Sequence, residues 1–425
     1  MRVLFVTFPW RTHLYLTVPM AWALRTAGHE VHVASSPELT GVITGTGLPA
    51  VAAGSAEPLQ DKGDRIIQQA ARTGMVLPRI EYDEAAVERL GWADLKTYYT
   101  LFTLIHQAAN DSMVEDLVAY CRWWKPDLVV WESMSYAGAI AAAAVGVPHA
   151  RMHLAMDVGH RLRRRFLGLR EHQAPGDRDD PVAEWLGGWA GKYGFDVSEE
   201  LLTGQFTIDQ MPDSVRLTSE VRNVSVRYVP HNGPSVIPEW SRRAPAAPRV
   251  LATFGVSMWS VAGSHPISVR EIQEILDSVA DLDIELVLTL SEKFQRKLKR
   301  VPGNTRIVEF APLHVVIPSC SAVIHHGGVP AFCGAASHGV PQLMVSLIAQ
   351  DARVRGARLA ELGAGLWIPP EEMTGPRFRE DLVRLLEDPS FRSGAERLRR
   401  EMLAQPSPND VVPELEKLAA EYTPR

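Results

Sequence analysis

Apolar runs alternate with amphipathic stretches along the whole chain. In the first half, strand-like runs occupy 2–8, 30–36 and 126–133, and one helix-like stretch occupies 17–29. Within the helical stretch Met20, Leu24 and Ala27 fall on one face, and Gly28 marks its end. The pattern predicts strand, helix and strand in this half, with a later buried strand that leads into an alanine-rich helix.

The second half repeats this pattern. Strand-like runs occupy 248–255, 284–291, 305–312, 321–328 and 341–347, and a helix-like stretch occupies 268–282. Continuous apolar strands that alternate with helices indicate parallel sheets covered on both faces. Two such halves predict an α/β protein with two Rossmann-like domains. Ligands of these sheets bind beyond the carboxyl ends of the strands, so the cleft between the two domains is the expected site.

The length of the chain also favours two domains. It has 425 residues, more than one hydrophobic core usually serves. We expect an N-terminal domain at 1–230 and a C-terminal domain at 249–405, joined by a proline-rich linker at 231–248. Residues 406–425 are expected to form a helix that packs back on the N-terminal domain. Weak periodicity over 53–91 predicts an irregular insertion.

Composition and charge narrow the class of protein. Hydrophobic residues make up 46% of the chain and charged residues 22%, as in ordinary globular proteins. A formal net charge of -6 gives no electrostatic footprint for nucleic acid, and the apolar stretches are too short to cross a membrane. The three cysteines lack the spacing of a metal site. These features predict a cytoplasmic protein that uses no metal and no cofactor.

Two polar residues of the first half follow strand ends. His13 lies between the first strand and its helix, where an imidazole could act as a general base or cap the helix. Glu132 ends the strand at 126–133, where its carboxylate could orient a histidine or serve as a helix N-cap. No G-x-G-x-x-G pattern follows the first strand, so a nicotinamide or flavin dinucleotide is not expected there.

The stretch HHGG, from His325 to Gly328, ends an apolar strand of the second half. Gly327 and Gly328 let a ligand approach the backbone, and the helix that follows offers free N–H groups and a positive dipole end. His326 could add a hydrogen bond or a charge. The alternative is that both histidines only complete a strand end, but the second Rossmann-like half favours phosphate binding.

Further polar residues have weaker signals. Ser257 could donate its hydroxyl to a phosphate or cap a turn, and Asp351 could bind sugar hydroxyls or cap a helix. The pattern DRD at 177–179 is typical of metal sites in one nucleotide-sugar transferase fold, but no strand precedes it and we expect no metal there. Arginines crowd the helix-like stretch at 158–169, as an ordinary solvated face or a docking face for an acidic partner.

Together these stretches resemble the GT-B fold nucleotide-sugar glycosyltransferases of antibiotic biosynthesis, and most closely the macrolide and polyketide deoxysugar transferases. The resemblance covers nearly the whole chain. It is carried by AWALRTAGHEV, PDLVVWE, EELLTGQFTID, RYVPHNGPSVIPEW, PSCSAVIHHGG and the block HHGG…GVPQ…D…R…LGAG. The fold that it implies is two Rossmann-like domains that face each other across a cleft.

The resemblance also implies roles for single residues. His13 falls on the family's catalytic base, and Glu132 falls where many members keep an aspartate paired with that base. His326 falls on the histidine that binds the diphosphate, together with Gly327 and Gly328. Ser257 falls on a hydroxyl residue near the phosphates. Asp351 falls on the acid that touches the donor sugar.

The chain departs from the family pattern after the glycines. The usual Ala-Gly-Thr or Ala-Gly-Ser is here Val329, Pro330 and Ala331. Pro330 removes one N–H that a phosphate could use, and such a charge-assisted bond is worth about 1.5–3 kcal/mol. Ala352 follows Asp351 where glutamine is usual. The lost polar contact suits a donor sugar with few hydroxyls, a deoxysugar.

The resemblance therefore predicts an inverting, metal-independent transfer of a deoxysugar from a dTDP-sugar to a hydroxyl of a hydrophobic polyketide aglycone. Trp10, Tyr15 and the insertion at 53–91 are expected to shape the aglycone site. A helper protein that resembles a cytochrome P450 is expected to dock near 158–169. Three alternatives stay open: an aromatic polyketide acceptor such as an anthracycline, a nucleotide-sugar epimerase, and a non-catalytic partner subunit. The oligomeric state is open too, a homodimer included.

Overall fold

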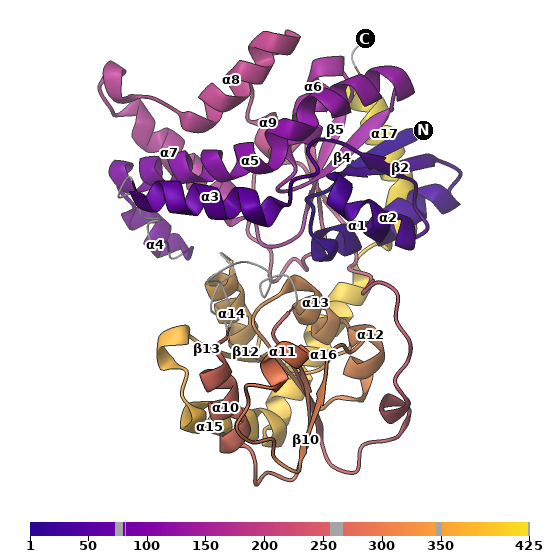
Figure 1. Ribbon diagram of the computed structural model, residues 1–425, viewed down its shortest axis with the longest axis vertical. Coiled ribbons are helices and arrows are strands. Elements are labelled where there is room, and N and C mark those ends of the chain that lie inside the picture. The colour runs from indigo at the N-terminus through magenta and orange to yellow at the C-terminus, as the bar shows by residue number, and fades with distance from the viewer. Residues whose placement is uncertain (73–79, 81, 256–266, 346–350, 424–425) are drawn as a thin grey trace. The chain divides into compact units, whose positions relative to one another are not determined.

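The computed structural model describes all residues except 73–79, 81, 256–266, 346–350 and 424–425. The contacts divide the chain into two compact units. Unit 1 comprises Met1–Gln210, Leu217–Val226 and Pro406–Arg425, and unit 2 comprises Met211–Arg216 and Arg227–Gln405. Figure 1 shows that each unit encloses its own sheet among helices.

Unit 1 is built on a parallel sheet in the order β3-β2-β1-β4-β5-β6-β7. Its strands are β1 (Arg2–Val6), β2 (Glu30–Ser35), β3 (Ala50–Ala52), β4 (Leu128–Glu132), β5 (His149–His153), β6 (Phe206–Asp209) and β7 (Asn223–Ser225). The strands β4 and β5 are buried along their whole length, as expected for a sheet that helices cover on both faces. The predicted parallel sheet of the first half is confirmed.

The helices of unit 1 are α1 (Arg11–Thr26), α2 (Thr40–Gly45), α3 (Leu59–Arg72), α4 (Glu84–Arg89), α5 (Trp92–Trp124), α6 (Tyr136–Val145), α7 (Val158–Glu171), α8 (Pro181–Tyr193), α9 (Glu200–Thr203) and α17 (Pro408–Tyr422). The alanine-rich α6 packs closely on the sheet. A Cβ on Gly138 would lie 2.7 Å from Cβ of Trp131 and 3.0 Å from Cβ of Val6. Glycine at position 138 therefore lets α6 approach the strands β1 and β4, which lead to the candidate site.

The prediction of an irregular insertion over 53–91 is wrong for much of that segment. Residues 59–72 form α3, which packs against α5, and residues 84–89 form α4. The segment is polar overall and contains Gly63, although the few apolar residues of 59–72 follow helical spacing. Packing against a neighbouring helix supplies stability that local propensity does not.

Unit 2 is built on a parallel sheet in the order β10-β9-β8-β11-β12-β13. Its strands are β8 (Arg249–Thr253), β9 (Glu285–Thr289), β10 (Thr305–Val308), β11 (Ala322–His325), β12 (Gln342–Val345) and β13 (Gly365–Ile368). Its helices are α10 (Val269–Ser278), α11 (Glu292–Gln295), α12 (Leu313–Val316), α13 (Val329–Ser337), α14 (Ala352–Glu361), α15 (Gly375–Glu387) and α16 (Pro389–Ala404). This sheet is also parallel throughout, as predicted.

The last helix returns to unit 1. It packs against α1, and Nε2 of His29 lies 2.9 Å from Oε1 of Glu416. Residues 231–248 belong to unit 2, where the Trp240 ring lies beneath the guanidinium groups of Arg249 and Arg306. The domain boundaries inferred from the sequence remain predictions. The two compact units divide the chain near the same boundaries.

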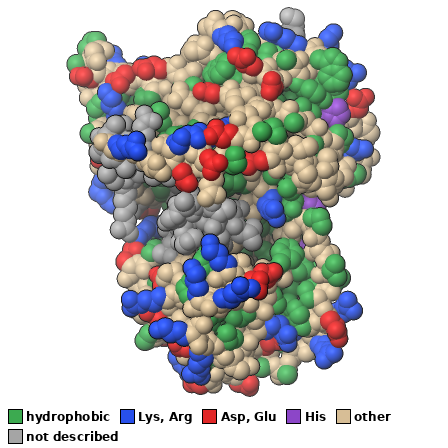
Figure 2. All heavy atoms as spheres, in the orientation of Figure 1, with side chains coloured by type: hydrophobic (Ala, Val, Ile, Leu, Met, Phe, Trp, Pro, Cys, Tyr) green, Lys and Arg blue, Asp and Glu red, His purple; other side chains and the backbone are tan. Residues whose placement is uncertain are grey.

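The surface of each unit carries charges of both signs. On the face shown in Figure 2, Lys and Arg side chains are interspersed with Asp and Glu side chains. Among the described residues, none of the helices combines the length and apolar character that a membrane crossing requires.

Candidate active site

A first candidate region lies where the strand order of unit 1 reverses. Strands β1 and β4 are neighbours, with Val6 opposite Trp131, although β1 connects to β2 and β4 to β5 on opposite sides. Such a reversal leaves a crevice at the carboxyl ends of the two strands. His13 stands in the first turn of α1, directly beyond β1, and Glu132 is the last residue of β4.

His13 and Glu132 form a close pair at this crevice. Nδ1 of His13 lies 3.1 Å from Oε1 of Glu132, and the His13 side chain is 18% exposed while that of Glu132 is fully buried. This separation is within hydrogen-bonding distance, although the oxygen lies off the line of the ring N–H. Because Nδ1 faces the carboxylate, Nε2 is the nitrogen left to take up a proton.

The surroundings of Glu132 keep its carboxylate ionised. Burial by itself would raise the pKa of Glu132, but the neighbouring His13 and hydrogen bonds from Ser133 and from the backbone N–H of Met134 outweigh it, and the pKa lies below its ordinary value. Ser135 Oγ donates a further hydrogen bond at 3.4 Å. A negative charge therefore faces His13 at neutral pH.

The turn that carries Glu132 is fixed by a buried amide on α5. Nδ2 of Asn110 donates to the carbonyl of Met134 at 3.1 Å, and Oδ1 accepts from the backbone N–H of Ala137 at 3.0 Å. Asn110 is 2% exposed. No sequence pattern indicated a role for Asn110, because that role depends on a contact between α5 and the distant turn after β4.

Aromatic rings surround His13 on one side. The rings of Phe8 and Trp10 lie 5.5 Å and 5.3 Å from the imidazole, measured between centroids. Tyr15 is half-buried on α1. The structure thus places Trp10 next to His13, and Tyr15 lies two positions further along α1.

A second candidate region lies at the corresponding reversal within unit 2. Strands β8 and β11 are neighbours there, with Thr253 opposite His325. His325 is fully buried, its Nε2 lies 2.8 Å from Oε1 of Gln342, and its Nδ1 accepts from the N–H of Gly327 at 3.0 Å. Burial lowers the pKa of His325 to about 3, so the ring is neutral. His325 therefore serves the fold, as the alternative interpretation of a completed strand end requires.

His326 has a different position. Its ring lies against the backbone of Gly255 and Gly328, where an added Cβ would come within 2.6 Å and 2.9 Å of Cε1. Burial lowers the pKa of His326 to about 4, and the charge of Arg355 adds to the effect, while contact with the backbone of Thr253 opposes it. The imidazole is therefore neutral near pH 7, so it can bind an anion by a hydrogen bond but not by a positive charge.

The start of α13 presents backbone N–H groups next to His326. Gly327 adopts a φ of +89°, a conformation that favours glycine, and Gly328 is the N-cap residue of the helix. Pro330 lies in the first turn, and the first intrahelical bond runs from Phe332 N–H to the carbonyl of Gly328 at 3.0 Å. The N–H groups of Val329 and Ala331 therefore face the helix end without intrahelical partners. Pro330 removes the donor between them.

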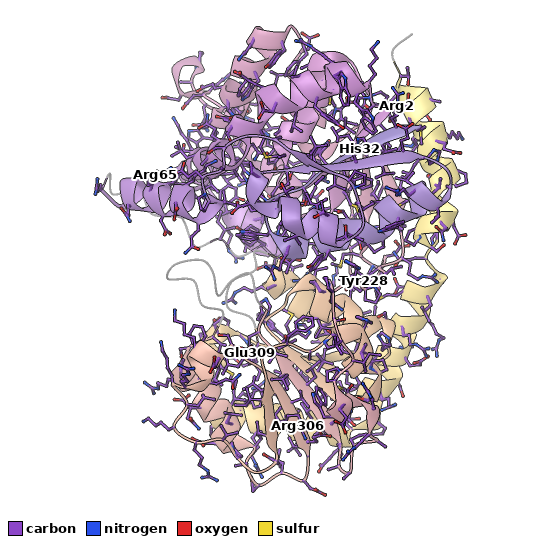
Figure 3. The ribbon with its side chains drawn as sticks, turned by 45° about the vertical axis from the view of Figure 1, so that its right-hand side comes forward. Arg2, His32, Arg65, Tyr228, Arg306 and Glu309 are labelled. Atoms are coloured by element: carbon purple, nitrogen blue, oxygen red, sulfur yellow. The ribbon has the colours of Figure 1, made fainter. Side chains whose placement is uncertain are left out.

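A tyrosine from the chain after β7 lies behind this turn. The hydroxyl of Tyr228, labelled in Figure 3, lies 3.5 Å from the carbonyl oxygen of Pro330. Tyr228 is buried, and burial raises the pKa of its phenol. It supports the first turn of α13 from within unit 2.

Asp351 stands at the N-terminus of α14, but its side chain does not cap the helix. Its carboxylate instead pairs with the buried Arg355, whose Nη1 lies 3.0 Å from Oδ2. Arg355 was not among the residues predicted from the sequence. Its position four residues after Asp351 is the spacing at which two side chains pair on one face of a helix. Ser257 lies outside the described residues.

Both domain models of one family match the chain. The model for the N-terminal domain of erythromycin biosynthesis protein CIII-like proteins matches residues 22–255, and the model for their C-terminal domain matches residues 273–418. The chain belongs to this family of glycosyltransferases. The division of the models follows the two Rossmann-like halves.

Relatives and solved structures agree with this family. The 10-deoxymethynolide desosaminyltransferase of Streptomyces venezuelae is 46% identical over 429 residues, which cover 99% of this chain and 98% of that protein. The aclacinomycin-T 2-deoxy-L-fucose transferase of Streptomyces galilaeus is 42% identical over 435 residues, 99% and 97% of the two chains. The crystal structure of the glycosyltransferase VinC in complex with dTDP is similar with a TM-score of 0.86 at 37% identity, covering 99% of this chain and 100% of that one. The fold of this erythromycin biosynthesis protein CIII-like enzyme is accordingly GT-B.

In this family member, most arginines of α7 have partners within unit 1. Arg163 is buried, its Nη2 lies 2.6 Å from Oδ2 of Asp180, and it also pairs with Glu199. Arg165 donates to the carbonyl of Leu90. The interpretation of 158–169 as a uniform solvated or docking face therefore needs correction, because Arg163 is part of the core. Arg164, paired with Glu220 at 3.5 Å, remains largely exposed.

Proposed function

We propose that this glycosyltransferase moves a deoxysugar from a dTDP-sugar to a hydroxyl of a macrolide-type polyketide aglycone. The observation that carries the proposal is the His13–Glu132 pair at the crevice of unit 1. The names of the Streptomyces venezuelae relative, which acts on 10-deoxymethynolide with desosamine, and of VinC, which binds dTDP, support the acceptor and the nucleotide.

His13 acts as the general base in this proposal. Nε2 takes the proton from the acceptor hydroxyl while Nδ1–H faces the ionised Glu132. The carboxylate holds the tautomer that leaves Nε2 basic and stabilises the imidazolium that forms. The acceptor oxygen forms a bond to the anomeric carbon from the face opposite the diphosphate, and the bond from that carbon to the diphosphate oxygen breaks. The configuration at the anomeric carbon inverts.

The leaving diphosphate is stabilised by hydrogen bonds and by the helix dipole. His326, which is neutral near pH 7, donates one bond, and the N–H groups at the start of α13, after the Gly327–Gly328 turn, supply others. Ser257 donates its hydroxyl. Charge that develops on the diphosphate thus meets donors of this chain, and the proposed transfer requires no metal.

Asp351 binds the donor sugar in the proposal. A carboxylate has about four acceptor positions, and the pair with Arg355 uses part of them. The rest remain for the few hydroxyls that a deoxysugar keeps. Trp10 and Tyr15 are proposed to contact the aglycone, with Trp10 next to the base.

The test begins with calorimetric titration of dTDP and UDP against the wild type and His326→Ala. We expect dTDP to bind at micromolar levels and more tightly than UDP, and the variant to lose most of this affinity. Transfer is then measured with dTDP-desosamine and 10-deoxymethynolide, with and without a chelator. An aglycone that gains one sugar of inverted anomeric configuration supports the proposal. Absence of any dTDP binding by the wild type contradicts it.

A second acceptor class is an aromatic polyketide such as an anthracycline. The relative from Streptomyces galilaeus, named for aclacinomycin-T and a 2-deoxy-L-fucose, favours it at 42% identity. When 10-deoxymethynolide and aclacinomycin-T compete for the enzyme in the same reaction, the ratio of their products compares the kcat/KM values of the two acceptors. A higher value for aclacinomycin-T would replace the macrolide-type acceptor. A non-catalytic partner subunit would transfer to neither while still retaining its partner transferase in a pull-down.

A helper protein that resembles a cytochrome P450 is proposed to dock on the exposed side of α7. Arg164 is 61% exposed on its side chain, whereas Arg163 is buried against Asp180. Arg161→Glu with Arg164→Glu should therefore weaken a pull-down of the helper and leave the melting temperature unchanged. Arg163→Glu serves as the contrasting variant, because it should lower the melting temperature. Unchanged retention of the helper by the double variant would overturn this docking face.

A further inference from the structure

The donor side of unit 2 contains an arginine that is fully buried. Arg355 lies on α14, one turn after Asp351, with no exposed surface, and it is among the largest side chains buried to this degree. A buried guanidinium is costly unless nearby groups compensate its charge and its hydrogen bonds. Its partners therefore indicate what it does.

The guanidinium joins two segments of the proposed donor site. Nη2 donates to the carbonyl oxygen of Gly327 and, at 3.3 Å, to Oδ1 of Asp351, while Nη1 lies 3.0 Å from Oδ2. The group also lies 5.4 Å from the ring centre of Phe332 on α13. One rigid fork thus touches the glycine turn, the acid and the helix that begins at the turn.

The peptide of Gly327 is held from its other side as well. Its N–H donates to Nδ1 of His325, whose Nε2 lies 2.8 Å from Oε1 of Gln342 on β12. A continuous buried path therefore runs from Gln342 through His325 and Gly327 to Arg355 and Asp351. The path contains no exposed side chain.

These contacts can order the turn at Gly327, because a glycine has little intrinsic preference for one backbone conformation. Gly327 adopts a φ of +89°, and a glycine loses more conformational freedom on ordering than any other residue. We propose that Arg355 is a positioning residue that holds the diphosphate-binding turn and the sugar-binding acid in one fixed arrangement. The inference rests on the proposed function, since it concerns the same donor site.

The electrostatic effect of Arg355 agrees with this role. Burial is the main cause of the lowered pKa of His325 and His326, and the positive charge of Arg355 lowers both further. The charge thus favours the neutral form of His326 while the fork orders the turn beside it.

The experiment compares Arg355→Met and Arg355→Lys with Arg358→Met, a matched change on the same helix. Arg358 is exposed and pairs only with Glu361 among the partners described. Each variant is measured by thermal unfolding, by calorimetric titration of dTDP, and by saturation-transfer NMR with thymidine, which lacks phosphate.

We expect Arg355→Lys to recover the melting temperature lost in Arg355→Met, because an ammonium compensates the charge of Asp351. The lysine cannot reach Gly327 and Asp351 as a fork, so its affinity for dTDP should stay about 10- to 100-fold below the wild type, as for other displaced site groups. Thymidine should bind the lysine variant as it binds the wild type. Arg358→Met should match the wild type in all three measurements.

Two results would overturn the inference. Wild-type affinity of Arg355→Lys for dTDP would show that the fork is not needed. Equal loss of thymidine and dTDP binding in that folded variant would show a general disturbance of unit 2 in place of a positioning role. If the wild type itself fails to bind dTDP, the proposed function fails first, so the two failures are distinguishable.

Discussion

Nδ1 of His13 lies 3.1 Å from Oε1 of Glu132, and the two side chains come from neighbouring strand ends that are far apart in the sequence. Glutamate is one methylene longer than aspartate, the acid that the family resemblance led us to expect at this position. The extra length is accommodated, because the carboxylate folds back onto its own turn and accepts hydrogen bonds from Ser133 and Met134. The pair is therefore set by the crevice and not by the length of the acid alone.

Replacing Glu132 by glutamine tests this pair. The variant keeps the volume and the hydrogen-bond acceptor but loses the charge that faces His13. We expect kcat to fall by about 10²–10⁴-fold, since the histidine tautomer is no longer fixed. The affinity for dTDP, which belongs to unit 2, should be unchanged. Steady-state transfer kinetics and calorimetry measure the two quantities, and full transfer by the variant would contradict the assigned role.

The donor affinity should change little with pH in the neutral range. Because the pKa of His326 is lowered to about 4, its ring stays neutral at every pH well above that value. We expect dTDP-glucose, whose diphosphate has no terminal ionisation near neutrality, to bind equally between about pH 5.5 and 8. Titration calorimetry at several pH values checks this. An affinity that falls steadily as the pH rises through 6 to 7 would indicate a charged imidazole instead.

Acid should destabilise the fold through its buried histidines. Burial lowers the pKa to about 4 for His106 and His149 and to about 3 for His325. Between these values and the unperturbed 6.5, the unfolded chain binds protons that the folded chain does not. Stability is therefore full above about pH 6.5 and falls with decreasing pH, by about 1.4 kcal/mol per unit for each histidine. Melting temperatures from pH 7.5 down to 5 measure the slope.

A matched variant tests the origin of that slope. His149→Gln keeps an acceptor for the indole N–H of Trp131, which now donates to Nδ1 of His149 at 3.1 Å, but it cannot be protonated. Its slope should be shallower by the contribution of one histidine. Identical slopes would show that other groups govern the acid response.

Pro330→Ala should strengthen donor binding. The change restores an N–H in the first turn of α13, next to those of Val329 and Ala331. A charge-assisted bond is worth about 1.5–3 kcal/mol, so the affinity for dTDP should rise about tenfold or more. Calorimetric titration measures it directly. Unchanged affinity would mean that the diphosphate does not use this position of the helix.

Much of the fold could be predicted because it depends on patterns within short segments. The strands β4 and β11 read as continuous apolar runs, since a strand that helices cover on both faces must be apolar along its length. The ends of such apolar runs also showed where strands end, and the candidate residues His13, Glu132 and His326 lie at or just after these ends. Helix α3 was missed because its sequence is polar overall, although its few apolar residues follow helical spacing and the helix packs against α5.

The sequence by itself determined two parallel-sheet domains, the strand ends that carry the candidate residues, and the loss of one donor at Pro330. Only the tertiary structure decided that His325 is buried against Gln342 on another strand, whereas His326 lies against the backbone of Gly255 and Gly328. It also decided that Arg163 is buried against Asp180 and that Arg355 reaches the carbonyl oxygen of Gly327. These contacts join side chains and backbone groups from separate segments of the chain, which come together only in the folded protein. A pattern within one short segment therefore cannot predict them.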